Sequence, residues 1–178
     1  MEIRIASYVA GSFLLEREPH QWHTIVVLDS GSQVTDFVEK HARTSCIRRF
    51  DDVEGPFAGK EPPRRIMIEQ CLDFSSGKDK LLVCCRAGQG RSVATAYVIG
   101  CREFGVRKAI TILNPMRHRP NRLVVQIGAT ILDNPDILGE FDHWRCRHAH
   151  IRLSDYYDEM EAEFEALAAQ GAMNRICR

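Results

Sequence analysis

A cysteine and an arginine stand six residues apart in this sequence, on either side of a loop that contains two glycines. Cys85 ends the apolar run 81–85, which is typical of a buried strand, and Ser92 can cap the apolar helix that follows. Gly88 and Gly90 allow the loop backbone unusual φ angles and a close approach to a ligand. The backbone N–H groups of this loop can therefore converge on one anion, as they do in phosphate-binding nests.

The predicted anion site also contains a nucleophile. Arg91 can bind two phosphate oxygens at once, and the positive end of the following helix attracts the same anion. That positive field favours the thiolate of Cys85, which then faces the phosphorus atom in line. Cys101 and Cys146 also precede an arginine by six residues, but neither ends a strand before a glycine-containing loop. The predicted phosphate-binding residues are Arg86, Ala87, Gly88, Gln89, Gly90 and Arg91.

The segment Val83-Cys84-Cys85-Arg86-Ala87-Gly88-Gln89-Gly90-Arg91-Ser92 resembles the signature loop of the cysteine-dependent protein tyrosine phosphatase superfamily, especially its compact dual-specificity type. The order of elements from about Thr24 to Leu132 is similar as well. The resemblance implies that Cys85 forms a phosphocysteine intermediate and that Arg91 binds phosphate and stabilises the transition state. It also implies that Ser92 helps the intermediate to break down, and that no cofactor is needed.

The same resemblance implies an aspartate on a mobile upstream loop, which acts as general acid. A phenolate, with a pKa of about 10, leaves poorly unless it is protonated as its bond to phosphorus breaks. Asp51, Asp52 and Glu54 lie where a strand gives way to a Gly- and Pro-rich stretch, which is typical of a lid. We favour Asp52 as the acid, with Asp51 as the second candidate. The chain departs from the family at Cys84, because a histidine usually precedes the nucleophile.

Strand-like and helix-like segments alternate around these residues. Short apolar strands are predicted at 24–28, 46–50 and 81–85, and helices at 34–42, 64–74, 92–103, 106–113 and from Pro120 onward. This alternation predicts an α/β fold with a central, mostly parallel sheet flanked by helices, as in dual-specificity phosphatases. We predict a catalytic domain over residues 1–138. A C-terminal extension over residues 139–178 contains one helix, which Ser154 can cap.

Composition and charge argue against several classes of protein. The 178 residues carry 24 basic and 24 acidic side chains, so no overall basic field favours nucleic acid. The uncharged run 92–101 is too short to span a bilayer, so no membrane insertion is expected. Seven cysteines and an N-terminus unlike a signal peptide indicate a cytoplasmic location. The spacing of His143, Cys146, His148 and His150 matches no common zinc pattern, so no metal is expected.

These observations predict a hydrolase that cleaves phosphate monoesters through a phosphocysteine intermediate. The expected substrate is a phosphorylated protein or peptide, with phosphotyrosine favoured and phosphoserine or phosphothreonine also considered. Inositol-lipid enzymes of the superfamily tend to carry lysine in the loop, where this chain has the neutral Gln89. Three alternatives stay open: a phosphoinositide phosphatase, a phosphate-binding module with weak turnover, and a redox protein in which Cys84 or Cys71 pairs with Cys85. The oligomeric state is open as well.

Overall fold

The computed structural model describes residues 1–32 and 37–151 of the chain. They contain a four-stranded sheet in the order β1-β4-β2-β3, in which every strand pairing is parallel. The strands are β1 (Glu2–Ser7), β2 (His23–Leu28), β3 (Thr44–Arg49) and β4 (Lys80–Cys85). The predicted α/β class with a parallel sheet is confirmed, and each predicted strand overlaps an observed one.

The two central strands are buried on both faces. Every residue of β2 is buried, and so is every residue of β4 after Lys80. A parallel strand covered on both faces reads as a continuous apolar run, which is why the sequence pattern indicated both of these strands. The edge strand β1 was not predicted, although exposed Glu2 and Arg4 alternate with partly buried residues along it, as in a half-buried strand.

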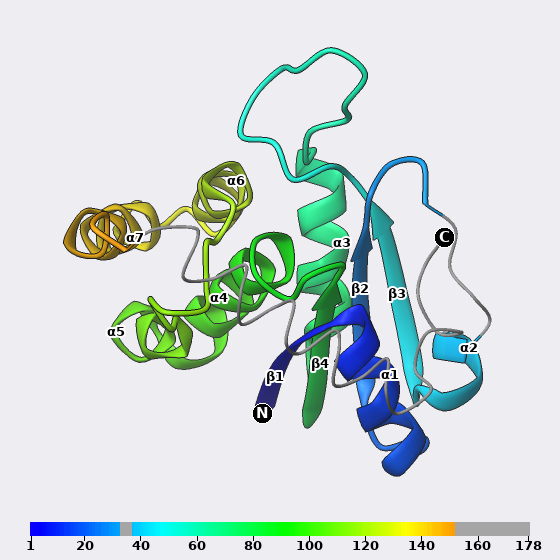
Figure 1. Ribbon diagram of the computed structural model, residues 1–178. Coiled ribbons are helices and arrows are strands. Elements are labelled where there is room, and N and C mark those ends of the chain that lie inside the picture. The colour runs from blue at the N-terminus through cyan, green and yellow to red at the C-terminus, as the bar shows by residue number, and fades with distance from the viewer. Residues whose placement is uncertain (33–36, 152–178) are drawn as a thin grey trace.

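Helices cover both faces of the sheet (Figure 1). Figure 1 shows α4, α5, α6 and α7 gathered on the left of the sheet, with α1 and α2 on the right. The described helices are α1 (Tyr8–Arg17), α2 (Phe37–His41), α3 (Arg65–Ser75), α4 (Arg91–Phe104), α5 (Val106–Ala109), the short 3-10 helix η1 (Ile110–Ile112), α6 (Arg122–Ile131) and α7 (Asp136–Arg147).

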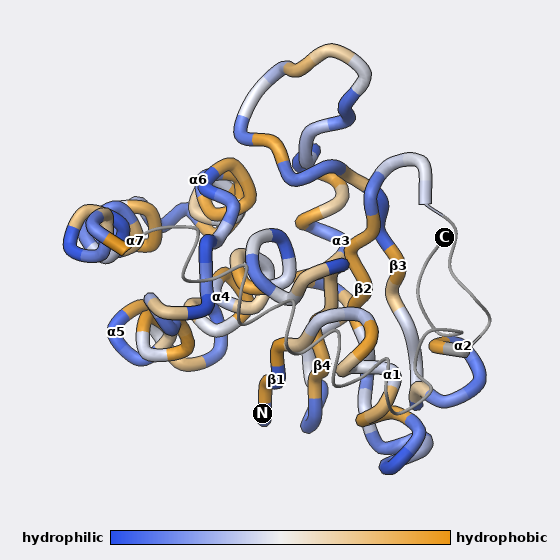
Figure 2. Tube along the Cα trace, in the orientation of Figure 1, coloured by the Kyte–Doolittle hydropathy of each residue, from blue (hydrophilic) through white to orange (hydrophobic). Residues whose placement is uncertain are grey.

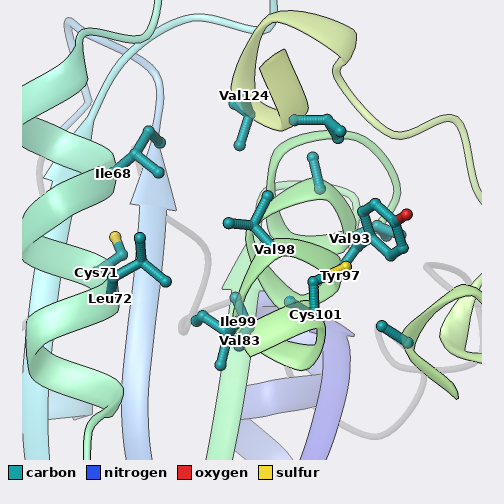
Figure 3. Close-up of a cluster of buried hydrophobic side chains, with 14 of the residues drawn as sticks. Ile68, Cys71, Leu72, Val83, Val93, Tyr97, Val98, Ile99, Cys101 and Val124 are labelled. Carbon is teal, nitrogen blue, oxygen red and sulfur yellow. The ribbon is translucent and has the colours of Figure 1, made fainter. Parts of the chain in front are cut away.

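Successive residues of the central strands point into two separate cores, because side chains alternate between the faces of a strand. On one face, Val83 of β4 packs among side chains of α3, α4 and α6, including Leu72, Val98 and Val124 (Figure 3). On the other face, Cys84 packs in the cluster that contains residues of α1 and α2. Figure 2 shows the resulting contrast, with orange on the strands and blue at the exposed ends of α1 and β4.

Two described helices had no sequence prediction. Helix α1 begins at Ser7, whose Oγ accepts a hydrogen bond from the N–H of Ala10 at 3.1 Å. Helix α7 buries Phe141 and Trp144 in the larger core, and it spans the predicted boundary between residues 138 and 139. The helix predicted from Ser154 lies outside the described residues, as do residues 34–36 of the helix predicted over 34–42.

None of the helices within residues 1–32 and 37–151 combines the length and the apolar run that a membrane crossing needs.

Candidate active site

The candidate site lies where the parallel strands end. In a parallel sheet all carboxyl ends meet at one edge, so residues that follow different strands come together there. Cys85 is the last residue of β4, Asp29 follows β2, and Phe50, Asp51 and Asp52 follow β3. Three segments that are far apart in the sequence therefore contribute to one site.

The loop between β4 and α4 is packed tightly against β1. Gly88 has a φ of +73°, a conformation that side chains other than glycine rarely adopt. A Cβ atom at Gly88 would also overlap the backbone of Ala6 and Ser7. The carbonyl of Arg86 accepts a hydrogen bond from the N–H of Tyr8 at 3.4 Å. The predicted phosphate loop (residues 85–91) is thus supported by the junction between β1 and α1.

Cys85 and Ser92 are in direct contact. Both residues are buried, and Cys85 Sγ lies 3.0 Å from Ser92 Oγ. The predicted capping role of Ser92 is wrong, because Gly90 is the N-cap residue of α4 and no side chain caps this helix. Ser92 is instead the second residue of α4, which turns its hydroxyl back toward the end of β4. A hydroxyl in this place can donate a hydrogen bond to a thiolate.

Arg91 is almost completely buried, at 4% exposure, beneath the loop. Its Nη1 donates to the carbonyl of Phe50 at 2.8 Å and lies 2.9 Å from Oδ1 of Asp29. Its Nε is buried and has no hydrogen-bond partner, and Oδ2 of Asp52 is 3.9 Å from it. An unsatisfied buried N–H of a guanidinium is costly, and an oxyanion seated in the loop would satisfy it.

Asp51 is a structural residue in this arrangement. Its buried carboxylate accepts hydrogen bonds from Ser30 Oγ and from the N–H of Glu61, each at 2.7 Å. Burial alone would raise its pKa, but these hydrogen bonds and nearby Lys60 lower the pKa of Asp51 to about 2. The N–H of Asp51 also donates to the carbonyl of Glu61 at 2.7 Å. Asp51 therefore closes the base of the loop that runs from 51 to 61.

Asp52 lies against the phosphate loop. A Cβ atom at Gly90 would overlap the Asp52 carboxyl, so no side chain separates the two. Oδ1 of Asp52 accepts a hydrogen bond from Asn121 Nδ2 at 2.8 Å, and its side chain is 45% exposed. Desolvation raises the pKa of Asp52 above its usual value, and the Asn121 hydrogen bond and Arg91 oppose that rise only in part.

Glu54, the third candidate acid, is bound by residues of α6 and α7. Its carboxylate accepts hydrogen bonds from the N–H of Arg122 at 2.8 Å and from Arg145 Nη1 at 3.1 Å. It also lines a separate cavity of about 240 Å³, together with Trp144 and Arg145 of α7 and residues before α6 and after α7. None of the residues 85–92 lines that cavity. Glu54 thus links the loop 51–61, which we call the acid loop, to α6 and α7.

The remaining predicted phosphate-binding residues form the rim of the loop. Arg86 is exposed, whereas Ala87 and Gln89 are half-buried. The carbonyl of Gln89 accepts a hydrogen bond from the N–H of Arg119 at 3.0 Å, and the carbonyl of Gly90 accepts one from Asn121 at 3.4 Å. The segment before α6 thus supports the loop through two backbone hydrogen bonds.

Two residues of this site were missed by the sequence reasoning, namely Asp29 and Asn121. Asp29 follows the central strand β2 as Cys85 follows β4, so its position after an apolar strand was an available signal. Asn121 is the N-cap of α6, and its Oδ1 accepts from the N–H of Val124 at 3.1 Å. The sequence can indicate such a cap, but it gives no sign that the other end of the amide meets Asp52.

The other cysteines lie elsewhere. Cys84 points to the opposite face of the sheet from Cys85, where its Sγ lies against Gly11 of α1. Cys71 lies beside Cys46, and a hydrogen bond between these thiols, with burial, raises the pKa of Cys71. The structure therefore turns Cys84 away from Cys85, whereas Cys71 and Cys85 lie in the same core and are not bonded to each other. Within residues 1–32 and 37–151, no group of three or more metal-ligating side chains is assembled.

Among known proteins, this chain is similar to solved structures. No protein-family model matches the sequence, and no curated protein does. Among solved structures, the chain is similar to the one described as "Crystal structure of Tk-PTP in the active form". That similarity covers 78% of this chain and 92% of the other, with 18% sequence identity and a TM-score of 0.48.

Proposed function

We propose that this protein is a cysteine-dependent phosphatase that hydrolyses phosphate monoesters, with phosphotyrosine in proteins or peptides as the favoured substrate. The observation that carries the proposal is the buried Arg91 guanidinium, whose Nε has no hydrogen-bond partner, at the end of the loop that begins at Cys85. A buried cation with an unsatisfied donor, on the same glycine-containing loop as a thiol, fits a bound phosphoryl group. We propose in addition that the protein is cytoplasmic, as predicted from its cysteine content.

In the first step, the Cys85 thiolate attacks phosphorus and the bond between phosphorus and the leaving oxygen breaks. The leaving oxygen takes a proton from Asp52, whose raised pKa favours the protonated form that this step needs. Arg91 and the loop N–H groups stabilise the charge on the equatorial oxygens. Asp51 is a poor acid for this step, since its carboxylate is held ionised by hydrogen bonds away from the loop.

In the second step, water attacks the phosphocysteine and gives its proton to the Asp52 carboxylate. The bond between sulfur and phosphorus breaks, and phosphate and the Cys85 thiolate are released. The Ser92 hydroxyl, 3.0 Å from Cys85 Sγ, can donate a hydrogen bond to the sulfur as it gains charge. No redox step and no further reactant are required.

The choice of substrate follows from the loop and from the acid. An aryl phosphate needs protonation of a phenolate oxygen, which an aspartic acid beside the loop can supply. The loop carries the neutral Gln89 and a single additional cation at Arg86, so its charge suits one phosphoryl group rather than a polyphosphorylated inositol.

The test is phosphate release from a phosphotyrosine peptide without added metal. The native chain should release phosphate, and Cys85→Ser should release none while still binding the peptide. Cys146→Ser is the matched control, because Cys146 also precedes an arginine by six residues but is exposed on α7. Asp52→Asn should slow release strongly. Turnover retained in Cys85→Ser would refute the proposed mechanism, and no turnover in the native chain would point to another ester or to a binding module.

A further inference from the structure

Asn121 connects the proposed acid to the rest of the site. It is 2% exposed and stands immediately before α6. Its Nδ2 donates to Oδ1 of Asp52 at 2.8 Å and to the carbonyl of Val53 at 3.2 Å. Its own N–H donates to the carbonyl of Gly90 at 3.4 Å. One buried residue thus contacts both the acid loop and the phosphate loop.

The orientation of the Asn121 amide is fixed by its neighbours. The N–H of Val124 can only donate, so the atom that faces it must be the amide oxygen. The carbonyl of Val53 can only accept, so the atom that faces it must be the amide nitrogen. Rotating the amide by half a turn would leave both contacts unsatisfied. Asn121 therefore meets Asp52 as a donor.

This donor decides which oxygen of Asp52 can carry a proton. Oδ1 accepts from Asn121, so a proton on Oδ1 would face another N–H. The proton of the neutral acid therefore belongs on Oδ2. Oδ2 is the oxygen that lies against Gly90 and 3.9 Å from Arg91 Nε, on the side of the phosphate loop. The leaving group of a substrate in that loop meets the protonated oxygen.

We propose that Asn121 is a positioning residue for the general acid, which turns the protonated Oδ2 of Asp52 toward the leaving oxygen. This inference rests on the proposed function, because it assigns a partner to the acid of that reaction. The second contact, to the Val53 carbonyl, holds the backbone next to Asp52 in the same place. Holding an acid in the reactive geometry is a recognised source of rate, since small displacements from it are costly.

The first test uses two esters in Asn121→Ser. Serine is as good an N-cap as asparagine, so α6 keeps its cap, but the shorter side chain does not reach Asp52. Phenyl phosphate releases a phenolate with a pKa of about 10 and depends on the acid. A nitrophenyl phosphate releases a far more acidic phenol and depends on it little. We expect kcat to fall at least about tenfold on the phenyl ester, with a much smaller change on the nitrophenyl ester.

The control is Asn134→Ser. Asn134 precedes α7, and its Oδ1 accepts from the N–H of Asp136 at 3.1 Å, so it supports a helix start without touching Asp52. This variant should leave kcat unchanged on both esters. Equal losses on both esters in Asn121→Ser would mean that Asn121 only supports the fold, and no loss on either would also overturn the proposal.

A second readout needs no turnover. The titration of the Asp52 carboxyl, followed by carbon NMR and assigned with Asp52→Asn, should shift to higher pH in Asn121→Ser, because a donor to the ionised form is lost. Asn121→Asp, which keeps size and cap but adds a like charge, should shift it further. An unchanged Asp52 titration in both variants would overturn the proposal. A native chain that cleaves neither ester would count against the favoured aryl phosphate substrate, and the NMR titration would still decide whether Asn121 orients Asp52.

Discussion

Oδ1 of Asp29 lies 2.9 Å from Nη1 of Arg91, so the residue after β2 holds the guanidinium of the phosphate loop from behind. The carbonyl of Phe50, which follows β3, accepts from the same Nη1 at 2.8 Å. One terminal nitrogen thus has two oxygen partners, while Nε has no hydrogen-bond partner. Because Asp29 and Phe50 both contact Nη1, the N–H of Arg91 Nε stays available to a ligand.

Asp29→Asn tests this relationship. The charged hydrogen bond to Arg91 contributes roughly 1.5–3 kcal/mol, so its loss should lower kcat about tenfold or more. KM should stay the same or fall, because removal of a carboxylate makes the site more attractive to an anion. Steady-state kinetics on a phosphotyrosine peptide separate the two constants. A raised KM with an unchanged kcat would contradict an orienting role.

Gly88→Ala should be far more damaging than Gly59→Ala. Both glycines have a positive φ, +73° and +72°, which costs an alanine about 1–2 kcal/mol. Gly59 has open space around it, whereas a Cβ at Gly88 overlaps the backbone of β1, which adds about 1–3 kcal/mol. Urea unfolding midpoints measure the difference. Equal midpoints for the two variants would show that the loop can move away from β1.

Asp51→Asn should reduce stability more than it changes the chemistry. The folded pKa of about 2 lies below the ordinary value near 3.9, so ionised Asp51 contributes about 2 kcal/mol of unfolding free energy at neutral pH. That contribution is complete above pH of about 4 and is lost as the pH falls toward 2. Urea unfolding at pH 7 and at pH 3 should therefore show a larger gap between native and variant at pH 7. A variant that folds normally but whose kcat falls far more on a phenyl ester than on a nitrophenyl ester would identify Asp51 as the acid.

Cys84→Ala should leave turnover nearly unchanged, with a stability loss of about 1 kcal/mol from the buried space it vacates. Cys84 lies on the α1 side of the sheet and Cys85 on the α4 side, so their thiols point apart. Mass spectrometry of the native chain after mild peroxide should show no disulfide between Cys84 and Cys85. Detection of that disulfide would revive the redox alternative.

The sequence predicted the elements that have a strong local pattern. The strands β2 and β4 are continuous apolar runs, and α4 is apolar on nearly every side because it packs in the centre of the larger core. The loop from Cys85 to Arg91 was recognisable because its residue types, its spacing and its flanking strand all point to one chemistry. These features depend on neighbours within about ten residues along the chain.

What the sequence could not predict depends on contacts between distant segments. β1 is a short edge strand whose alternation covers only a few residues, and its partner β4 lies far along the chain. The separate roles of Asp51 and Asp52 come from Glu61 on one side and Asn121 on the other, and no local pattern relates these residues. Ser92 looked like a helix cap because the sequence does not show that α4 begins at Arg91.

The strand order has a consequence for how the chain folds during synthesis. In the order β1-β4-β2-β3, β1 has no sheet partner other than β4, and β4 is the last of the described strands to leave the ribosome. Until residue 85 emerges, β1 and one edge of β2 are unpaired and open to wrong association. The strand that completes the sheet is also the one that carries Cys85. A nascent chain therefore cannot present its nucleophile in an assembled loop before the centre of its sheet has closed.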